Sequence, residues 1–551
     1  MRSASESSQI TSLPDSSHIT NGVNAEGTLD TPPVAQGALG LWDAVSIIVG
    51  IVVGAGIYQT APTIFFLSGS SQTALILWGT AGVLSLIGAL CYAELATTYP
   101  RDGGDIVYLS RAFGSWAGFL FGWVQLTIIL TGSIGMMAFV FANYSIRLFK
   151  DAFDLDLGMF SAFAFAGGAV LLLTLSNVLG VVFGKVVQNI LTLAKVIGLG
   201  AIIAAGFMAP SPSAWTEPGL PAAPALGVAL VLILYTYGGW NDAAFVAAEV
   251  RDGKKNIARS LILGILIIAL LYLLVNYAYV NALGYTKSFQ SQQIAADVLN
   301  QGFGKGGVTL MCVLVMISAL GAVNGLIFTG ARVYSTIGKD HAVLSWMSGW
   351  DRQHGAPVPA LITQGVLALA LIFLVGTQQG REAINSVLDL TATTTVTQVK
   401  EVDGQKIEVT EKAGHWLKPI KWQTEDPSKS QNIGVGLRIT NLAKDGFDTL
   451  LTCTAPIFWA FFLLTGVSLF VLRERDHHIE RPFKVPFYPE LPLIFCISCS
   501  YMLYSSLTYA LIDKGWAGGV VLLGVVPLVV GLPLYRLSQL MKQPVGTGVK
   551  G

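Results

Sequence analysis

The stretch GIVVGAGIYQT, residues 50–60, decides how this chain folds. It lies inside the first long apolar run, which extends from Leu41 to about Leu67. About 20 apolar residues in a helix cross the core of a bilayer, so this run is predicted to span a membrane. Glycine is about 1 kcal/mol worse than alanine inside a helix. Gly54 and Gly56 therefore predict either a close helix–helix contact or a break in the helix at mid-span.

The composition of the whole chain indicates a membrane protein. Of its 551 residues, 53% are hydrophobic and 12% are charged, which is too few charges for a water-soluble chain of this length. Lysine plus arginine and aspartate plus glutamate number 33 each, and this balance argues against a nucleic-acid partner. The five cysteines lie in or beside apolar runs, without the spacing of a disulfide framework or a zinc site. We therefore expect no cofactor and no metal.

Apolar runs of spanning length occur about twelve times along the chain. They lie near 42–68, 73–97, 115–147, 159–182, 186–208, 224–249, 260–283, 307–337, 358–377, 448–472, 490–512 and 517–536. An even number places both chain ends on one side of the membrane, and the lysines and arginines of the short loops concentrate on that side. Both termini are therefore predicted to be cytoplasmic, in a plasma (inner) membrane.

The segments outside the runs complete the predicted organisation. A polar segment between runs nine and ten alternates around Asp403-Gly404, which predicts a β-hairpin. The predicted parts are a disordered cytoplasmic tail (1–38), spans one to nine (39–379), an extracytoplasmic insertion with the hairpin (380–446), spans ten to twelve (447–540) and a second cytoplasmic tail (541–551).

A second apolar run is also interrupted by glycines, and this favours a helix break over a close helix–helix contact in the first run. Residues 234–250 read LYTYGGWNDAAFVAAEV and place Gly238-Gly239 at mid-span, five spans after the first interruption. Two such spans in matching positions indicate an inverted-repeat transporter. We predict an all-α integral membrane fold in which spans one to five are repeated upside down by spans six to ten. The first and sixth helices would be discontinuous, and two C-terminal helices would follow.

The two predicted breaks suit an amino acid. The N–H groups bared around Gly54 and Gly56 start a half-helix, whose partial positive charge favours a carboxylate. The freed carbonyl groups of both breaks favour an ammonium group. Glycine allows the ligand to approach the backbone closely, because it has no Cβ. A zwitterion between the two breaks is therefore the predicted substrate.

The chain resembles the amino acid–polyamine–organocation superfamily in six motifs. They are GIVVGAGIY, CYAELATTYPRDGGDIVYLSRAFG (91–114), YTYGGWN (235–241), EVRDGKKNIARS (249–260), AVNGLIFTGARVYS (322–335) and ERPFKVPFYP (480–489). Within the superfamily the chain looks most like the L-type amino acid transporters and their bacterial relatives. The resemblance covers spans one to eleven, and it implies alternating access with the substrate at the middle of the bilayer.

The same resemblance implies a set of substrate-binding residues. They are Gly54, Ala55, Gly56, Ile57, Ser133, Tyr235, Thr236, Gly238 and Asn241. The backbone N–H groups of the first three would hold the carboxylate, and Tyr235 would close over the pocket as an aromatic lid. Asn241 would contact the substrate or hold the unwound segment. For Tyr235 and the neighbouring Tyr237 and Trp240, an aromatic packing cluster is the alternative.

Lys195 is the most informative ionisable residue. It lies inside the fifth span, where an unpaired ammonium group costs several kcal/mol. Several sodium-independent members of the superfamily have a lysine here, where sodium-coupled relatives bind an ion between the first and eighth spans. Lys195 is therefore predicted to replace that ion, as a fixed brace or as a proton carrier. Snorkelling of the side chain to the membrane surface is the alternative.

Charged residues near the inner ends of spans two and six predict a gate. Glu94 and Glu249 lie near Arg101, Arg251 and Arg259, so salt bridges among them would close the inner side, with Tyr235 closing the outer side. Solvated loop charges are the alternative.

Asp242 is a departure from many relatives, which carry an uncharged residue after the asparagine of this motif. It could face a cationic substrate, accept a proton or pair within the bundle.

These observations predict a secondary active permease for amino acids rather than an enzyme, since no nucleophile–base pairing stands out. Transport would be sodium-independent, by proton symport or by exchange. The alternatives are a membrane amino-acid sensor that binds without transport, a permease for polyamines or other cationic substrates, and a passive channel. The short outer loops contain no cysteine, so no disulfide-linked subunit is expected.

Overall fold

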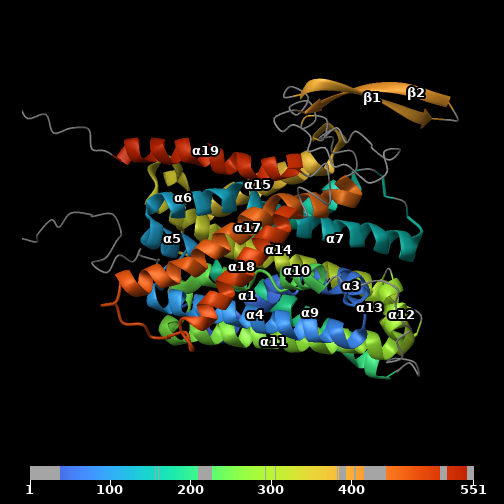
Figure 1. Ribbon diagram of the computed structural model, residues 1–551, viewed down its shortest axis with the longest axis horizontal. Coiled ribbons are helices and arrows are strands. Elements are labelled where there is room, and N and C mark those ends of the chain that lie inside the picture. Colours follow the sequence, from blue (N-terminus) through green and yellow to red (C-terminus); the bar gives the residue numbers. More distant parts are fainter. Residues whose placement is uncertain are drawn as a thin grey trace, which may run out of the picture.

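The computed structural model describes residues 37–542 apart from 156, 159, 209–225, 292, 305, 381–382, 384–391, 403–404, 415–441 and 509–517. In this part of the chain, long apolar helices lie side by side in one bundle (Figure 1). Nine helical segments of the described residues are long and apolar enough to cross a membrane, and two shorter apolar helices accompany them. The protein is therefore a helical membrane protein, as predicted. Nearly all of the predicted tails 1–38 and 541–551 lies outside the described residues.

The helices follow the predicted runs wherever these are described. The first half of the chain forms α1 (Leu41–Val52), α2 (Gly56–Gln59), α3 (Ala61–Ser68), α4 (Ser71–Thr98), α5 (Asp105–Phe113), α6 (Ser115–Val124), the π-helical turn η1 (Gln125–Ile129), α7 (Leu130–Phe153), α8 (Ser161–Val178) and α9 (Val181–Met208). The second half forms α10 (Leu226–Thr236), the 3₁₀ helix η2 (Trp240–Glu249), α11 (Gly253–Leu283), α12 (Tyr285–Gln290), α13 (Ile294–Phe303), α14 (Gly307–Asp340), η3 (Ala342–Ser348), α15 (Val358–Gly376), α17 (Leu442–Arg475), α18 (Glu490–Thr508) and α19 (Gly518–Lys542).

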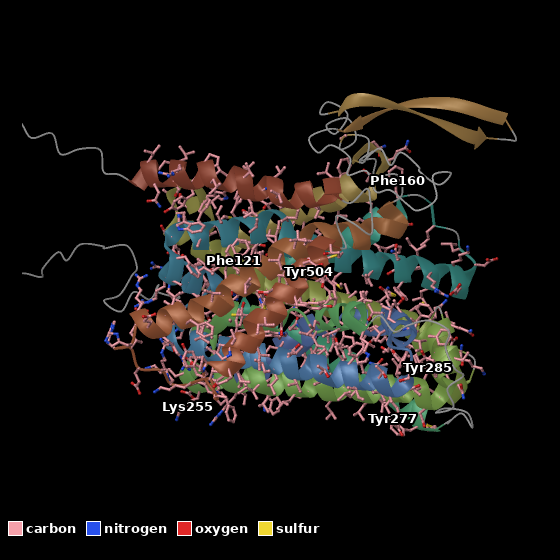
Figure 2. The ribbon with its side chains drawn as sticks, in the orientation of Figure 1. Phe121, Phe160, Lys255, Tyr277, Tyr285 and Tyr504 are labelled. Atoms are coloured by element: carbon pink, nitrogen blue, oxygen red, sulfur yellow. The ribbon has the colours of Figure 1, made fainter. Side chains whose placement is uncertain are left out.

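Long helices that are distant in sequence pack against one another. Helix α4 packs along α11, and α14 packs against α1, α7 and α9. The connecting helix α5 lies at one end of the bundle, and α12 and α13 lie at the other (Figure 1). Figure 2 shows Lys255 and Tyr277 towards opposite ends of α11, which runs the length of the bundle. The ends of the bundle therefore correspond to the two faces of a membrane.

The insertion between α15 and α17 contains the predicted hairpin. Strands β1 (Ala392–Val402) and β2 (Gln405–Gly414) pair antiparallel, with Val402 opposite Gln405. The predicted turn residues 403–404 lie outside the described residues. The two strands lie beyond the helices at the upper right of Figure 1, towards the end that carries α12.

Candidate functional site

The first apolar run is interrupted at the predicted position. Helix α1 ends at Val52 and α2 begins at Gly56, so residues 53–55 belong to no helix. The N–H of Gly54 turns back onto the carbonyl oxygen of Val52 at 2.7 Å. The N–H groups of Ala55 and Ile57 donate to no acceptor among the described residues. These amides lie at the start of α2, as an anion site at a helix N-terminus requires.

The sixth run is interrupted as well. Helix α10 ends at Thr236, and η2 begins at Trp240. Between them the N–H of Gly238 donates to the carbonyl oxygen of Tyr235 at 3.0 Å, and Gly239 has a φ of +103°. A Cβ at Gly239 would lie 2.7 Å from a methyl carbon of Ile51 on α1, so the turn needs glycine for both its conformation and its space.

The two breaks, about 180 residues apart in sequence, lie against each other. The hydroxyl of Tyr272 on α11 donates to the carbonyl oxygen of Val52 at 2.9 Å and approaches that of Thr236 at 3.3 Å. A Cβ at Gly56 would lie 2.9 Å from Cγ2 of Thr236. The hydroxyls of Thr60 and Thr236 are 3.3 Å apart. One buried tyrosine thus holds both unwound segments together.

Lys195 on α9 points into the first break. It is fully buried, and its Nζ donates to the carbonyl oxygens of Gly50 (2.6 Å), Val53 (2.9 Å) and Ser318 (3.0 Å). The hydroxyl of Ser318, on α14, also donates to Val53 O at 2.7 Å. Lys195 does not snorkel to a membrane surface. Its ammonium group joins the fifth, first and eighth spans through three carbonyl oxygens.

The other predicted pocket residues lie around the two breaks. Tyr235 is half-buried on the last turn of α10, and Asn241 is buried at the start of η2. Ser133, on α7, donates to the carbonyl oxygen of Ile129 at 2.8 Å. It lies one turn before Met137, whose sulfur would be 3.5 Å from a Cβ at Gly54. The third span therefore borders the first break.

The neighbouring aromatic side chains pack with one another. The Tyr237 ring packs against Trp78 and Tyr272, with centroids 6.0 and 5.1 Å apart. Trp240 packs against Tyr92 at 5.1 Å. Tyr237 and Trp240 therefore belong to an aromatic packing cluster, which was the alternative to a direct role in the pocket.

The arginine partners predicted for the inner gate are wrong. Glu249 forms a buried bidentate pair with Arg332 of α14, at 2.6 and 3.1 Å, whereas Arg251 is exposed. Glu94 binds Arg473 at 2.7 Å and Arg481 at 3.2 Å. The prediction failed because it chose arginines close in sequence, while the fold supplies arginines from α14, from the end of α17 and from the segment that follows α17.

Further ion pairs gather at the same end of the bundle. Lys185 donates to Asp43 at 3.1 Å and to the carbonyl oxygen of Ala38 at 2.6 Å, which ties α9 to α1. Asp476 accepts from Arg111 and Tyr99. Burial opposes the ionisation of Asp476, but these hydrogen bonds keep its pKa below the usual value. This end of the bundle is held together by charge pairs.

Sequence reasoning missed Tyr272, Ser318, Met137 and Arg332 as parts of the site. Arg332 lies within a motif that was quoted above, and its charge in an apolar span was an available signal. Tyr272 and Ser318 are single polar residues in apolar runs, and nothing in the sequence indicates which carbonyl groups they reach.

Interrupted helices that meet at a polar centre define a membrane transport protein. Residues 39–512 match the amino acid permease family model, and the chain belongs to that family. It is 30% identical over 348 residues to the mouse (Mus musculus) b(0,+)-type amino acid transporter 1, covering 61% of this chain and 70% of that protein. It is 31% identical over 334 residues to the mouse large neutral amino acids transporter small subunit 2, covering 59% and 62%.

These similarities confirm the relation to L-type transporters. The protein is an integral membrane amino acid permease, and its family is one of transporters rather than enzymes.

Proposed function

We propose that the protein is a secondary active permease that moves amino acids by alternating access, with spans one to five and six to ten as inverted repeats and two further C-terminal spans. The observation that carries the proposal is the meeting of the two interrupted spans at Tyr272, since a site between two broken helices is the binding arrangement of such transporters. Helix α1 and η2, which flank the two breaks, contact each other and both pack against α11 and α14.

The backbone geometry supports a defined orientation of the substrate. Its carboxylate binds the amides of the Gly54–Ile57 segment, because the N–H groups of Ala55 and Ile57 have no acceptor in the part of the chain that the structure describes. Its ammonium group faces the carbonyl groups freed at the second break. Thr236, Gly238, Asn241 and Ser133 line the site, and Tyr235 closes over it.

The position of Lys195 supports transport without sodium. Three carbonyl oxygens converge on its ammonium group, in the manner in which oxygen ligands surround a small cation. Lys195 takes the place of a coupling cation, and the cycle runs as proton symport or as exchange.

We place both termini and α5 on the cytoplasmic side of a plasma (inner) membrane, and the hairpin on the opposite side. In this orientation the pairs Lys185–Asp43, Arg332–Glu249 and Arg473–Glu94 close the cytoplasmic side. Opening to the cytoplasm requires these pairs to separate. We expect the permease to work without a disulfide-linked subunit.

Uptake by the purified protein in liposomes tests the proposal. Labelled amino acids are offered without sodium, with and without a pH gradient, and with and without unlabelled amino acid inside. Saturable uptake in any of these conditions supports a permease, and stimulation by internal amino acid identifies exchange. Saturable binding with no uptake in every condition identifies a sensor, and unsaturable flux identifies a channel.

A further inference from the structure

An acidic side chain is buried just beyond the second break without a cationic partner. Asp242, on the first turn of η2, is only 6% exposed. Its Oδ1 accepts a hydrogen bond from the amide nitrogen of Asn241 at 3.1 Å, and no lysine, arginine or histidine among the described residues pairs with it. A buried carboxylate is costly unless it is neutralised or paired.

A second buried acid lies nearby. Asp105, on α5, is 1% exposed, and its Oδ1 accepts from Tyr92 (2.7 Å) and Thr465 (2.6 Å). Its Oδ2 has no partner among the described residues. The titratable groups close enough to interact electrostatically with it are Tyr92 on α4, Tyr108 on α5 and Asp242 on η2. Burial raises the pKa of Asp105 to about 6.

Unpaired acceptors accompany the two acids. The amide oxygens of Asn241 and Gln125 are buried without a hydrogen-bond donor among the described residues. Gln125 belongs to the π-helical turn η1, and its backbone oxygen accepts from Tyr334 of α14 at 3.1 Å. Tyr334 in turn is close enough to interact electrostatically with Asp242. The unpartnered oxygens of Asp105, Asn241 and Gln125 are acceptors from three elements, and no positively charged donor among the described residues reaches them.

We propose that Asp242, supported by Asp105 and Asn241, forms a subsite for the positively charged side chain of the substrate, and that the permease carries cationic amino acids. The inference rests on the proposed function, because the backbone amides of the first break must hold the carboxylate. That carboxylate requirement favours an amino acid over a polyamine.

The spacing along η2 fits this class of substrate. Asp242 is the third residue of η2, so two steps of 3₁₀ helix at about 2.0 Å each place it about 4 Å along the helix from Trp240, where the second break ends. A lysine side chain places its amine five bonds from Cα, about 6 Å away when extended, from bonds near 1.5 Å. A charged hydrogen bond adds just under 3 Å. The head group can therefore occupy the breaks while the amine reaches Asp242.

Uptake of labelled L-lysine and L-leucine by proteoliposomes tests the subsite. The wild type is expected to take up lysine and to be inhibited by arginine and ornithine. Asp242→Asn is expected to raise the KM for lysine tenfold or more while leaving the KM for leucine, where leucine is carried, within about twofold. The matched control is Asp151→Asn, which removes an exposed carboxylate paired with Arg147 and leaves both substrates unaffected.

Each other result overturns the inference in a distinguishable way. If the wild type takes up leucine, but neither takes up lysine nor is inhibited by it, the subsite is refuted and the proposed permease function still stands. Suppose instead that a well-folded Asp242→Asn variant loses uptake of lysine and leucine equally and is no longer stimulated by a pH gradient. Asp242 is then assigned to proton transfer. Uptake of putrescine without lysine uptake contradicts the amino-acid class. No uptake of any amino acid refutes the proposed function itself. If the variant does not fold, the wild-type substrate profile still decides.

Discussion

Replacing Lys195 with methionine removes the ammonium group at the first break while keeping a chain of similar length. In the wild type, Nζ donates to the carbonyl oxygens of Gly50, Val53 and Ser318. Val53 O retains a donor in the variant, because the hydroxyl of Ser318 lies 2.7 Å away. Gly50 O has no such substitute, since the N–H of Gly54 binds Val52 O instead of continuing the helix.

The size of the effect follows from these contacts. A hydrogen bond to a charged group contributes about 1.5–3 kcal/mol, and a buried acceptor left without a donor costs a similar amount. The carbonyl group of Gly50 loses the ammonium donor without replacement, whereas that of Ser318 lies inside the continuous helix α14 and keeps its helical hydrogen bond. The conformation in which Lys195 joins α1, α9 and α14 is then destabilised by about 3 kcal/mol, which corresponds to a population change of about 150-fold. We expect kcat/KM for uptake to fall at least tenfold.

The assay compares Lys195→Met with Lys255→Met in the same liposome preparation. Lys255 is exposed on α11 and lies at the end of the bundle (Figure 2), so its replacement is expected to leave uptake unchanged. Lys195→Ala adds a second measurement. It opens the same carbonyl oxygens to a monovalent cation, so sodium or methylammonium is expected to restore part of its uptake.

A Lys195→Met variant with wild-type uptake and a wild-type pH profile would refute the reasoning. Loss of uptake that is independent of pH identifies a brace. Loss of the stimulation by a pH gradient, with exchange preserved, identifies a proton carrier.

Three further variants test the break, its tyrosine and the acid pair. Gly56→Leu is expected to abolish uptake while the protein remains folded in detergent, because even a Cβ there would lie 2.9 Å from Thr236; wild-type uptake would remove the first span from the site. Tyr272→Phe is expected to lower the free energy of unfolding by about 1–3 kcal/mol and to lower uptake, because its hydroxyl bonds both breaks. Tyr279→Phe is the neutral control, since its hydroxyl has no partner among the described residues. Equal thermal stabilities of the two variants would contradict this. The carboxyl group of Asp105 ionises as the pH rises through about 6, so the KM for lysine is expected to fall between pH 5 and 7. This change is expected to be smaller in Asp105→Asn. If Asp105→Asn shows the same pH dependence as the wild type, Asp105 does not contribute to lysine binding.

The membrane class, the helices and both interruptions could be predicted from the sequence, because each depends on local properties. About 20 consecutive apolar residues suffice to identify a span. The cost of glycine in a helix marked the positions where α1 and α10 end. The alternation on both sides of Asp403-Gly404 likewise indicated β1 and β2 before any tertiary contact was known.

Candidate site residues could be predicted only where a motif, or a charge inside an apolar span, marked their position. Lys195 was recognisable because an ammonium group inside a span demands a partner. Its actual acceptors, three backbone oxygens from α1, the first break and α14, have no side-chain signature in the sequence. The same limit explains why the salt-bridge partners of Glu94 and Glu249 were chosen wrongly.

The sequence by itself therefore determined which segments cross the membrane and where two of them break, since helix formation and apolar burial depend on neighbouring residues. Only the tertiary structure decided what the breaks face. Tyr272 reaches both breaks, and Arg332 reaches Glu249, because helix packing brings together residues separated by tens to hundreds of positions. The same packing leaves Asp242 without a cationic side chain beside it among the described residues, and no local pattern in the sequence indicates this.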